Sequence, residues 1–124
     1  MNISLAFSPC PNDTFMFGGI ALKRVLIPGY SFKICLHDIE SLNQYALLNT
    51  YDITKISFHC YLHTFENYSL LKVGSALGYG CGPVIVAKKN IHEKDLPNCL
   101  ISVPGELTTA NLLLKLFAPE IKNK

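Results

Sequence analysis

A short apolar strand that runs into a proline-bracketed polar turn constrains the fold of this chain most strongly. The apolar run covers residues 3–7, and the sequence S-P-C-P-N-D-T-F-M-F follows at 8–17. Pro9 and Pro11 keep the backbone extended and cannot donate to a sheet ladder. Residues 12–14 are Asn, Asp and Thr, which are types that cap helices. We therefore expect a strand, a rigid turn and a helix, the corner at which α/β proteins bind ligands.

Strand and helix signals alternate along most of the chain. Apolar runs predict strands at 3–7, 31–36, 52–56, 70–73, 83–87 and 100–103. Amphipathic or cap-led stretches predict helices at 13–25, 39–48 and 109–117, and a further helix could begin after Ser57. Asp38 stands where it can cap the second of these helices. Repeated β-α-β units predict an α/β fold with a mostly parallel sheet and helices on its faces.

The end of the chain predicts an incomplete second lobe. Residues 90–99 are polar and contain Pro97, which suits a crossover between lobes. We expect a first α/β lobe at 1–89, this crossover at 90–99, and the start of a truncated second lobe at 100–124. A single β-α unit after the crossover cannot bury both of its faces. The second lobe is therefore expected to be largely absent from this chain.

The composition excludes several classes of protein. Of the 124 residues, 49% are hydrophobic and 16% charged, which supports a folded core rather than disorder. The formal net charge of +2 is small and the basic residues are scattered, so no nucleic-acid partner is expected. No signal peptide or membrane helix is recognisable. We expect a cytoplasmic protein that has no membrane partner.

Two short motifs are candidates for holding an anion. Thr108, Thr109 and Ala110 stand at a predicted helix start, where backbone N–H groups and two hydroxyls could bind a carboxylate or phosphate. The alternative is an ordinary helix cap. The second motif, residues 55–57, follows a predicted strand, and Ser57 could donate to a ligand from a helix start. The alternative there is a surface lysine beside a capping serine.

Other reactive residue types form no strong site. The five cysteines show no C-x-x-C pair, which favours reduced, partly buried thiols, and Cys10 is either a nucleophile or, as we favour, a packed thiol. His59 and His63 share a helix face but lack the H-E-x-x-H pattern, so no metal site is expected. The glycines at 78–82 open no helix and are no dinucleotide fingerprint. We expect no cofactor.

Five ordered blocks together resemble one enzyme family. They read S-P-C-P-N-D-T-F at 8–15, D-I-E-S-L-N at 38–43, Y-D-I-T-K-I-S at 51–57, V-G-S-A-L-G-Y-G-C-G-P at 73–83 and V-P-G-E-L-T-T-A at 103–110. Their sequence, order and spacing resemble 1,4-dihydroxy-6-naphthoate synthase, a lyase of the futalosine route to menaquinone. The resemblance covers nearly the whole chain.

The resemblance implies a fold, a reaction and a binding site. The family has a periplasmic-binding-protein-like fold, in which two α/β lobes surround a cleft. It converts cyclic dehypoxanthine futalosine to 1,4-dihydroxy-6-naphthoate by proton abstraction and carbon–carbon cleavage. By resemblance, Lys55, Ile56, Ser57 and the pair Thr109-Ala110 belong to substrate-binding segments that hold a small-molecule carboxylate. Thr108 is added as the neighbouring hydroxyl of the same motif.

The chain departs from this family in length. The resemblance places the general-base histidine in the second lobe, beyond residue 124, so we assign no catalytic residue to this chain. We expect an N-terminal fragment of the lyase that is inactive alone, with a second chain or self-association able to complete the cleft. The alternatives are a small-carboxylate-binding module without catalysis and an inactive remnant of a truncated gene.

Overall fold

A computed structural model describes residues 1–121 and contains eight helices and strands in that range. In chain order they are β1 (Asn2–Phe7), α1 (Pro11–Ala21), β2 (Ser31–Leu36), α2 (Ile39–Leu47), β3 (Ile53–Thr54), α3 (Phe58–Thr64), the 3-10 helix η1 (Glu93–Asn98) and α4 (Thr109–Phe117). The strands expected at 3–7 and 31–36 are confirmed, as are the helices at 39–48 and 109–117.

The sheet is parallel and has its first strand in the middle. The strand order is β2-β1-β3, and β1 pairs in parallel with both neighbours. Leu5 of β1 lies opposite Ile34 of β2 and opposite Ile53 of β3. Leu5, Ala6 and Phe7 are buried because both edges of β1 are paired and both of its faces are covered. The predicted α/β class is confirmed as a three-stranded parallel sheet.

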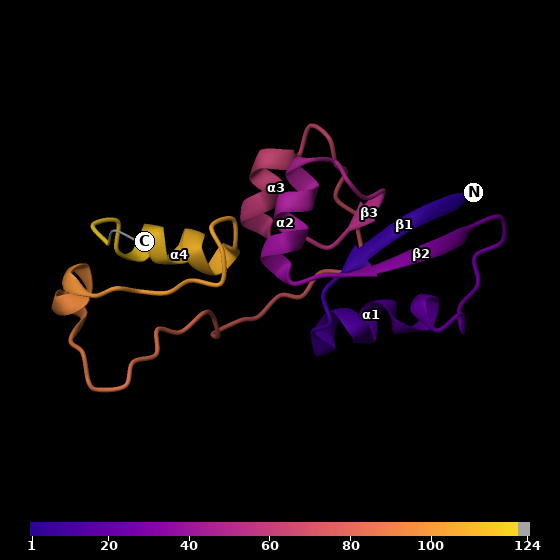
Figure 1. The fold of residues 1–124 in the computed structure, drawn as a ribbon. Coiled ribbons are helices and arrows are strands. Elements are labelled where there is room, and N and C mark those ends of the chain that lie inside the picture. The colour runs from indigo at the N-terminus through magenta and orange to yellow at the C-terminus, as the bar shows by residue number, and fades with distance from the viewer. Residues whose placement is uncertain (122–124) are drawn as a thin grey trace.

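Helices lie on both faces of the sheet. Figure 1 shows α1 on one side of the strands, and α2 and α3 on the other. The connection from β1 leads to β2 on one side of it, and the connection from β2 passes over β1 to β3 on its other side. Because parallel crossovers are right-handed, these opposite directions place their helices on opposite faces of the sheet. The strand order therefore reverses next to β1. In open α/β sheets the carboxyl ends of the strands at such a reversal form a ligand-binding crevice.

Three helices begin at caps that the sequence identifies. The Asp38 side chain accepts hydrogen bonds from the backbone N–H groups of Glu40 and Ser41 at the start of α2. Ser57 is the N-cap residue of α3, and Thr108 is that of α4. The Asp38 and Thr108 side chains satisfy N–H groups that have no partner inside the helix, whereas the Ser57 side chain makes no cap bond.

The first helix starts and ends earlier than the sequence predicts. Its N-cap residue is Cys10 and Pro11 is its first residue, because proline suits a position whose N–H needs no partner. Asp13 is consequently in the first turn. The helix ends at Ala21 rather than 25, and the backbone of Lys23 reaches a φ of 55°, which a right-handed helix cannot contain.

The C-terminal part forms a separate small cluster. Figure 1 shows a long irregular segment between α3 and η1, after which the chain returns to α3, and α4 then runs from there back toward η1. The cluster consists of Leu96, Leu114, Ala118 and Ile121, with Ile101 and Val103 packed against it. The boundaries expected at 1–89, 90–99 and 100–124 stay a prediction, and residues 122–124 lie outside the described residues.

Three of the predicted strands are not strands in the structure. Residues 70–73 and 83–87 are exposed and lie outside any helix or strand, and residues 100–103 have no sheet partner within residues 1–121. Val73 and Val86 are 79% and 85% exposed. Apolar content predicted these strands, but a strand also needs a neighbour for its N–H and C=O groups. The strand expected at 52–56 is shortened to Ile53–Thr54.

No helix within residues 1–121 has the length and apolar character needed to span a membrane.

The Asp38 cap should make stability depend on pH in the acid range. Hydrogen bonds from the Ser41 hydroxyl and backbone hold the pKa of the Asp38 carboxyl below its usual value. The stabilisation is therefore complete above about pH 4 and is lost as pH falls through the lowered native pKa. We expect Asp38→Ala to lower the melting temperature at pH 7, and this difference to shrink toward pH 2, where the neutral Asp38 carboxyl can still accept cap bonds but carries no charge.

Asp38→Asn is the matched control, because its side-chain oxygen still accepts the cap bonds but does not titrate. Melting temperatures followed by circular dichroism from pH 2 to 7 measure both effects. A difference between wild type and Asp38→Ala that stays constant over this range would contradict the prediction.

Candidate functional site

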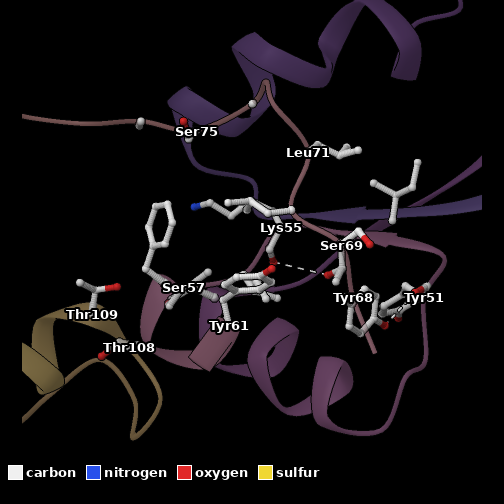
Figure 2. A pocket seen from close by; sticks show the side chains of 18 of the residues that line it. Tyr51, Lys55, Ser57, Tyr61, Tyr68, Ser69, Leu71, Ser75, Thr108 and Thr109 are labelled. Carbon is white, nitrogen blue, oxygen red and sulfur yellow. Dashed lines mark hydrogen bonds between the residues drawn. The ribbon is translucent and has the colours of Figure 1, made fainter. Parts of the chain in front are cut away.

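A cavity of about 860 Å³ lies beside the carboxyl end of β3. It is lined by residues 51–58, by the irregular segments 67–71 and 73–76, by residues 108–110, and by Phe17, Ile39, Asn49, Tyr61 and Pro104. Figure 2 shows Lys55, Ser57 and Thr109 around this space, carried by the end of β3, the start of α3 and the start of α4. The six residues that the sequence predicts as binding residues all line it: Lys55, Ile56, Ser57, Thr108, Thr109 and Ala110.

Lys55 brings a positive charge to the cavity and is fixed at both ends. Its backbone N–H donates to the Ala6 carbonyl at 2.9 Å, which extends the β1–β3 pairing. Its Nζ lies 3.3 Å from Asp13 Oδ1. The lysine side chain is 32% exposed and the aspartate side chain 1% exposed. Lys55 is thus a held cation at the cavity wall rather than a free surface lysine.

The proline-bracketed turn supplies the carboxylate that holds this lysine. Asp13 Oδ2 accepts hydrogen bonds from the Ser8 hydroxyl at 2.6 Å and from the Ser8 backbone N–H at 3.2 Å. The Ser8 hydroxyl oxygen in turn accepts from the Cys10 N–H at 3.3 Å. Asp13 also lies in the first turn of α1, where the helix dipole favours a negative charge. The turn therefore connects β1, α1 and the cavity lysine.

Ser57 lies at the start of α3 and is held by a side chain of α2. Its backbone N–H donates to Asn43 Oδ1 at 3.0 Å, and its hydroxyl oxygen accepts from Asn43 Nδ2 at 3.2 Å. The Ser57 side chain makes no cap bond within α3. Ser57 thus stands at the predicted helix start. Its backbone N–H is already used, which leaves the hydroxyl to face a ligand.

At the start of α4, Thr108 caps the helix, and the next residues present the first-turn N–H groups. The Thr108 hydroxyl donates to the Gly105 carbonyl at 2.8 Å and accepts from the Asn111 N–H at 3.4 Å, so Thr108 is an ordinary helix cap. Thr109 and Ala110 are half-buried in the first turn. The first N–H groups of a helix have no internal partner and lie at the positive end of its dipole. This edge is suited to an acceptor oxygen.

The histidine pair has a packing contact that the sequence did not predict. His59 is buried, and its Nδ1 lies 3.2 Å from the Thr108 carbonyl oxygen. This contact joins α3 to the start of α4 and so positions one wall of the cavity against the other. The His59 and His63 rings are 5.5 Å apart. Within residues 1–121, no three His, Cys, Asp or Glu side chains gather as metal ligands would.

Aromatic side chains form a further wall that sequence reasoning missed. Tyr51, Tyr61 and Tyr68 line the cavity (Figure 2). The Tyr68 hydroxyl donates to the Tyr51 carbonyl at 2.8 Å, and the Tyr51 hydroxyl lies 2.8 Å from His37 Nε2. Burial raises the pKa of both Tyr51 and Tyr68, so both stay neutral at pH 7. Rings with polar edges suit a flat ligand that carries oxygen atoms.

The exposure of the cysteines tests the prediction made for Cys10. Cys10 is exposed at the N-cap of α1, so the expectation of a packed thiol is wrong there. All five cysteines are free, and Cys60 is buried. The glycine-containing block at 73–83 reaches the cavity at residues 74–76. Gly74 has a φ of 87°, a conformation that glycine adopts without strain.

The comparisons with known proteins agree with this fold. A family model described as menaquinone biosynthesis matches residues 3–123. The chain is 40% identical over 116 residues to a "1,4-dihydroxy-6-naphtoate synthase" of Thermus thermophilus. These aligned residues make up 94% of this chain and 42% of that relative. The chain is 36% identical over 119 residues to the enzyme of the same name from Streptomyces coelicolor, with coverages of 95% and 41%.

A solved structure supports the same conclusion. A crystal structure of a protein from Archaeoglobus fulgidus matches with a TM-score of 0.85 and 40% identity, over 93% of this chain and 42% of the other. The chain therefore belongs to the menaquinone biosynthesis family. The curated relatives that it matches are 1,4-dihydroxy-6-naphthoate synthases, which confirms the resemblance seen in the five sequence blocks. The chain spans about two fifths of the length of these relatives.

Removing either partner of the Asp13–Lys55 ion pair should destabilise the fold. Asp13→Ala leaves the buried Ser8 hydroxyl and N–H without an acceptor, which we expect to cost about 1–3 kcal/mol. Lys55→Met keeps both Ser8 bonds but should also destabilise the fold, because it leaves the buried Asp13 carboxylate without a charge partner. Urea unfolding measures the free energy of each variant.

Asn12→Ala is the matched control, since Asn12 is exposed in the same helical turn. Its stability should stay within about 0.5 kcal/mol of wild type. An Asp13→Ala variant as stable as the Asn12→Ala control would contradict the prediction.

Proposed function

We propose that this chain is the N-terminal, substrate-binding part of a 1,4-dihydroxy-6-naphthoate synthase. The full enzyme would be a carbon–carbon lyase of menaquinone biosynthesis that converts cyclic dehypoxanthine futalosine to 1,4-dihydroxy-6-naphthoate. The chain would form one lobe of a periplasmic-binding-protein-like fold. One observation carries the proposal: two motifs more than fifty residues apart, at 55–57 and 108–110, line one cavity at the carboxyl end of β3.

The donors around the cavity fit an aromatic carboxylate. The first turn of α4 offers N–H groups and the Thr109 hydroxyl, and Lys55 adds a positive charge. The charge of Lys55 is balanced by Asp13, so most of the affinity for an anion would come from the N–H and hydroxyl donors. Tyr51 and Tyr68 supply a wall for the aromatic ring. We propose that the substrate carboxylate lies between residues 55–57 and 109–110.

The catalytic base is proposed to come from outside this chain. Proton abstraction needs a group within hydrogen-bond reach of the substrate. None of the four histidines, which stand at 37, 59, 63 and 92, lines the cavity within residues 1–121. His59 is occupied by its contact with Thr108. The chain would therefore bind and orient the substrate, and another polypeptide would supply the base.

The partner would cover apolar surface that this chain leaves exposed. Val84, Val86, Leu100 and Leu116 are 70–85% exposed, although such side chains are usually buried. The matched relatives extend well beyond the part that this chain covers. We propose that a polypeptide equivalent to the rest of those relatives packs here and closes the cleft. In its absence, contact between copies of the chain would cover part of the same surface.

A second candidate function is a carboxylate-binding module that does not catalyse. The observation that favours it is that the cavity is formed by side chains of this chain alone. An assay of naphthoate formation separates the two functions. If the chain binds the ligand but shows no turnover with any completing polypeptide, the result supports the module. An inactive remnant would show neither binding nor turnover.

Replacing Thr109 should weaken binding of the carboxylate. Thr109→Val keeps the shape and removes the hydroxyl, so one hydrogen bond to a charged oxygen is lost. A loss of about 1.5–3 kcal/mol corresponds to roughly tenfold or more in the dissociation constant. Calorimetric titration with 1,4-dihydroxy-6-naphthoate under anaerobic conditions measures it. Thr109→Ser restores the hydroxyl and should restore most of the affinity; equal affinities for wild type and Thr109→Val would contradict the assignment.

The exposed face of α4 should promote association of the purified chain. Leu116 is 70% exposed and Phe117 59% exposed on this helix. We expect oligomers at tens of micromolar chain, detected by light scattering after size exclusion. Leu116→Glu should shift the population toward monomer, whereas Lys115→Glu, an exposed position of the same helix, should not. A wild-type chain that is wholly monomeric at these concentrations would contradict the proposed apolar contact surface.

A further inference from the structure

The candidate site is assembled from two parts of the chain that lie far apart in sequence. Residues 55–57 follow β3 and residues 108–110 begin α4, and both groups line the cavity (Figure 2). Between α3 and α4, residues 65–108 contain no helix or strand except the 3-10 helix η1. Holding the two ends of so long and irregular a connection together costs entropy. A contact outside the connection is therefore needed to fix the distance between the two groups of ligand donors.

His59 supplies such a contact from α3. It lies two residues after Ser57 and is 9% exposed. Its Nδ1 lies 3.2 Å from the carbonyl oxygen of Thr108, the N-cap residue of α4. The same oxygen accepts a helical hydrogen bond from the Leu112 N–H at 3.1 Å. A carbonyl oxygen has two lone pairs, so it can accept from both donors at once.

The contact fixes which ring nitrogen of His59 carries a proton. A carbonyl oxygen can only accept, so Nδ1 must be the donor. In the neutral ring the proton is therefore on Nδ1, and Nε2 is the acceptor nitrogen. The imidazolium also has a proton on Nδ1, so the hydrogen bond is kept in both states of the ring. His59 thus donates to the start of α4 in either state.

We propose that His59 is a positioning residue that holds the first turn of α4 against residues 55–57 and so completes the carboxylate site. It binds the carbonyl of Thr108, and the next two residues, Thr109 and Ala110, line the cavity. The inference rests on the proposed function, in which this cavity binds an aromatic carboxylate. It adds that a histidine outside the cavity lining raises the affinity by fixing the two groups of donors before the ligand arrives.

The surroundings of His59 suit a positioning role rather than contact with the ligand. His59 is not among the residues that line the cavity. Thr108 is 4% exposed, so the hydrogen bond between them is shielded from water and is stronger than it would be on the surface. His63 lies on the same helix with its ring centre 5.5 Å from that of His59, but it is exposed. The buried ring is therefore the one that links the two helices.

Three substitutions of His59 test the role by removing or moving one donor. His59→Leu removes the donor, His59→Asn places a nitrogen as many bonds from Cα as Nδ1, and His59→Gln places one as many bonds away as Nε2. We expect His59→Leu and His59→Gln to weaken binding of 2-naphthoate about fivefold, the value of one typical hydrogen bond. His59→Asn should stay within about twofold of wild type, because it restores the donor to Thr108. Fluorescence titration measures the dissociation constants.

A control variant and a double-mutant cycle show where His59 acts. His63→Leu changes the exposed histidine of the same helix and should alter 2-naphthoate binding by less than about twofold. In a His59→Leu background, Thr109→Val should weaken binding by less than about threefold, compared with roughly tenfold or more in the wild-type chain. The reason is that the Thr109 hydroxyl is no longer held in place when the donor to Thr108 is gone.

The protonation of the His59 ring gives a test in the wild-type chain itself. Proton–nitrogen-15 NMR spectra of chain labelled at histidine distinguish a proton on Nδ1 from one on Nε2. At about pH 8.5, where histidine is ordinarily neutral, we expect the His59 ring to carry its proton on Nδ1. The signal that disappears in His59→Asn identifies the residue. A proton on Nε2 alone would overturn the hydrogen bond and the positioning role with it.

The binding outcomes separate this inference from the proposed function. If wild type binds 2-naphthoate and His59→Leu binds it equally well, or if His59→Gln restores affinity as fully as His59→Asn, the positioning role is wrong and the proposed function stands. If the wild-type chain does not bind the probe, both are overturned. If His59→Leu does not fold, as judged by circular dichroism, the comparison of His59→Asn with His59→Gln decides. Loss with Leu, recovery with Asn and a proton on Nδ1 support the inference.

Discussion

The buried carboxylate of Asp13 is the interaction on which the N-terminal part of the structure depends. It accepts from the hydroxyl and backbone of Ser8 at the end of β1, sits in the first turn of α1, and holds Lys55 after β3. A charge can be buried only if it is paired and hydrogen-bonded. Strand, helix and cavity lysine therefore have to be placed together, and the proline-bracketed turn makes that placement rigid.

Local signals predicted most of the first ninety residues, since each element carries its own start. Asp38 and Ser57 mark helix starts, and the apolar strands at 3–7 and 31–36 pair within this chain. The same local reasoning failed at 70–73 and 83–87, because an apolar run becomes a strand only when a neighbour pairs with it. That neighbour is a tertiary property, and nothing within a run of valines and leucines encodes whether it is present.

In the candidate site, the residues that offer hydrogen-bond donors were predictable from the sequence, but the residues that hold them in place were not. Position at a strand end or a helix start predicted the six lining residues, because those places have N–H and hydroxyl groups to offer. The contacts of Asn43, His59 and the Tyr51–Tyr68 wall join residues fourteen to forty-nine positions apart. No spacing rule within one helix or strand could have paired them. Asn43 was visible only as part of a helical motif, on the apolar side of α2.

Under the proposed function, this chain would bind the substrate and another part of the enzyme would supply the catalytic base. Recognition needs rigid donors, and here they stand on helix starts braced by buried polar side chains, with Asn43 behind Ser57 and His59 behind Thr108. Catalysis needs in addition a base placed against the reacting atom and a closed, dry cleft. The apolar side chains at 83–87 and on α4 are exposed in this structure. Under the proposed function, the rest of the enzyme would bury such surface and bring the base to the cleft in the same step, which would couple assembly to activity.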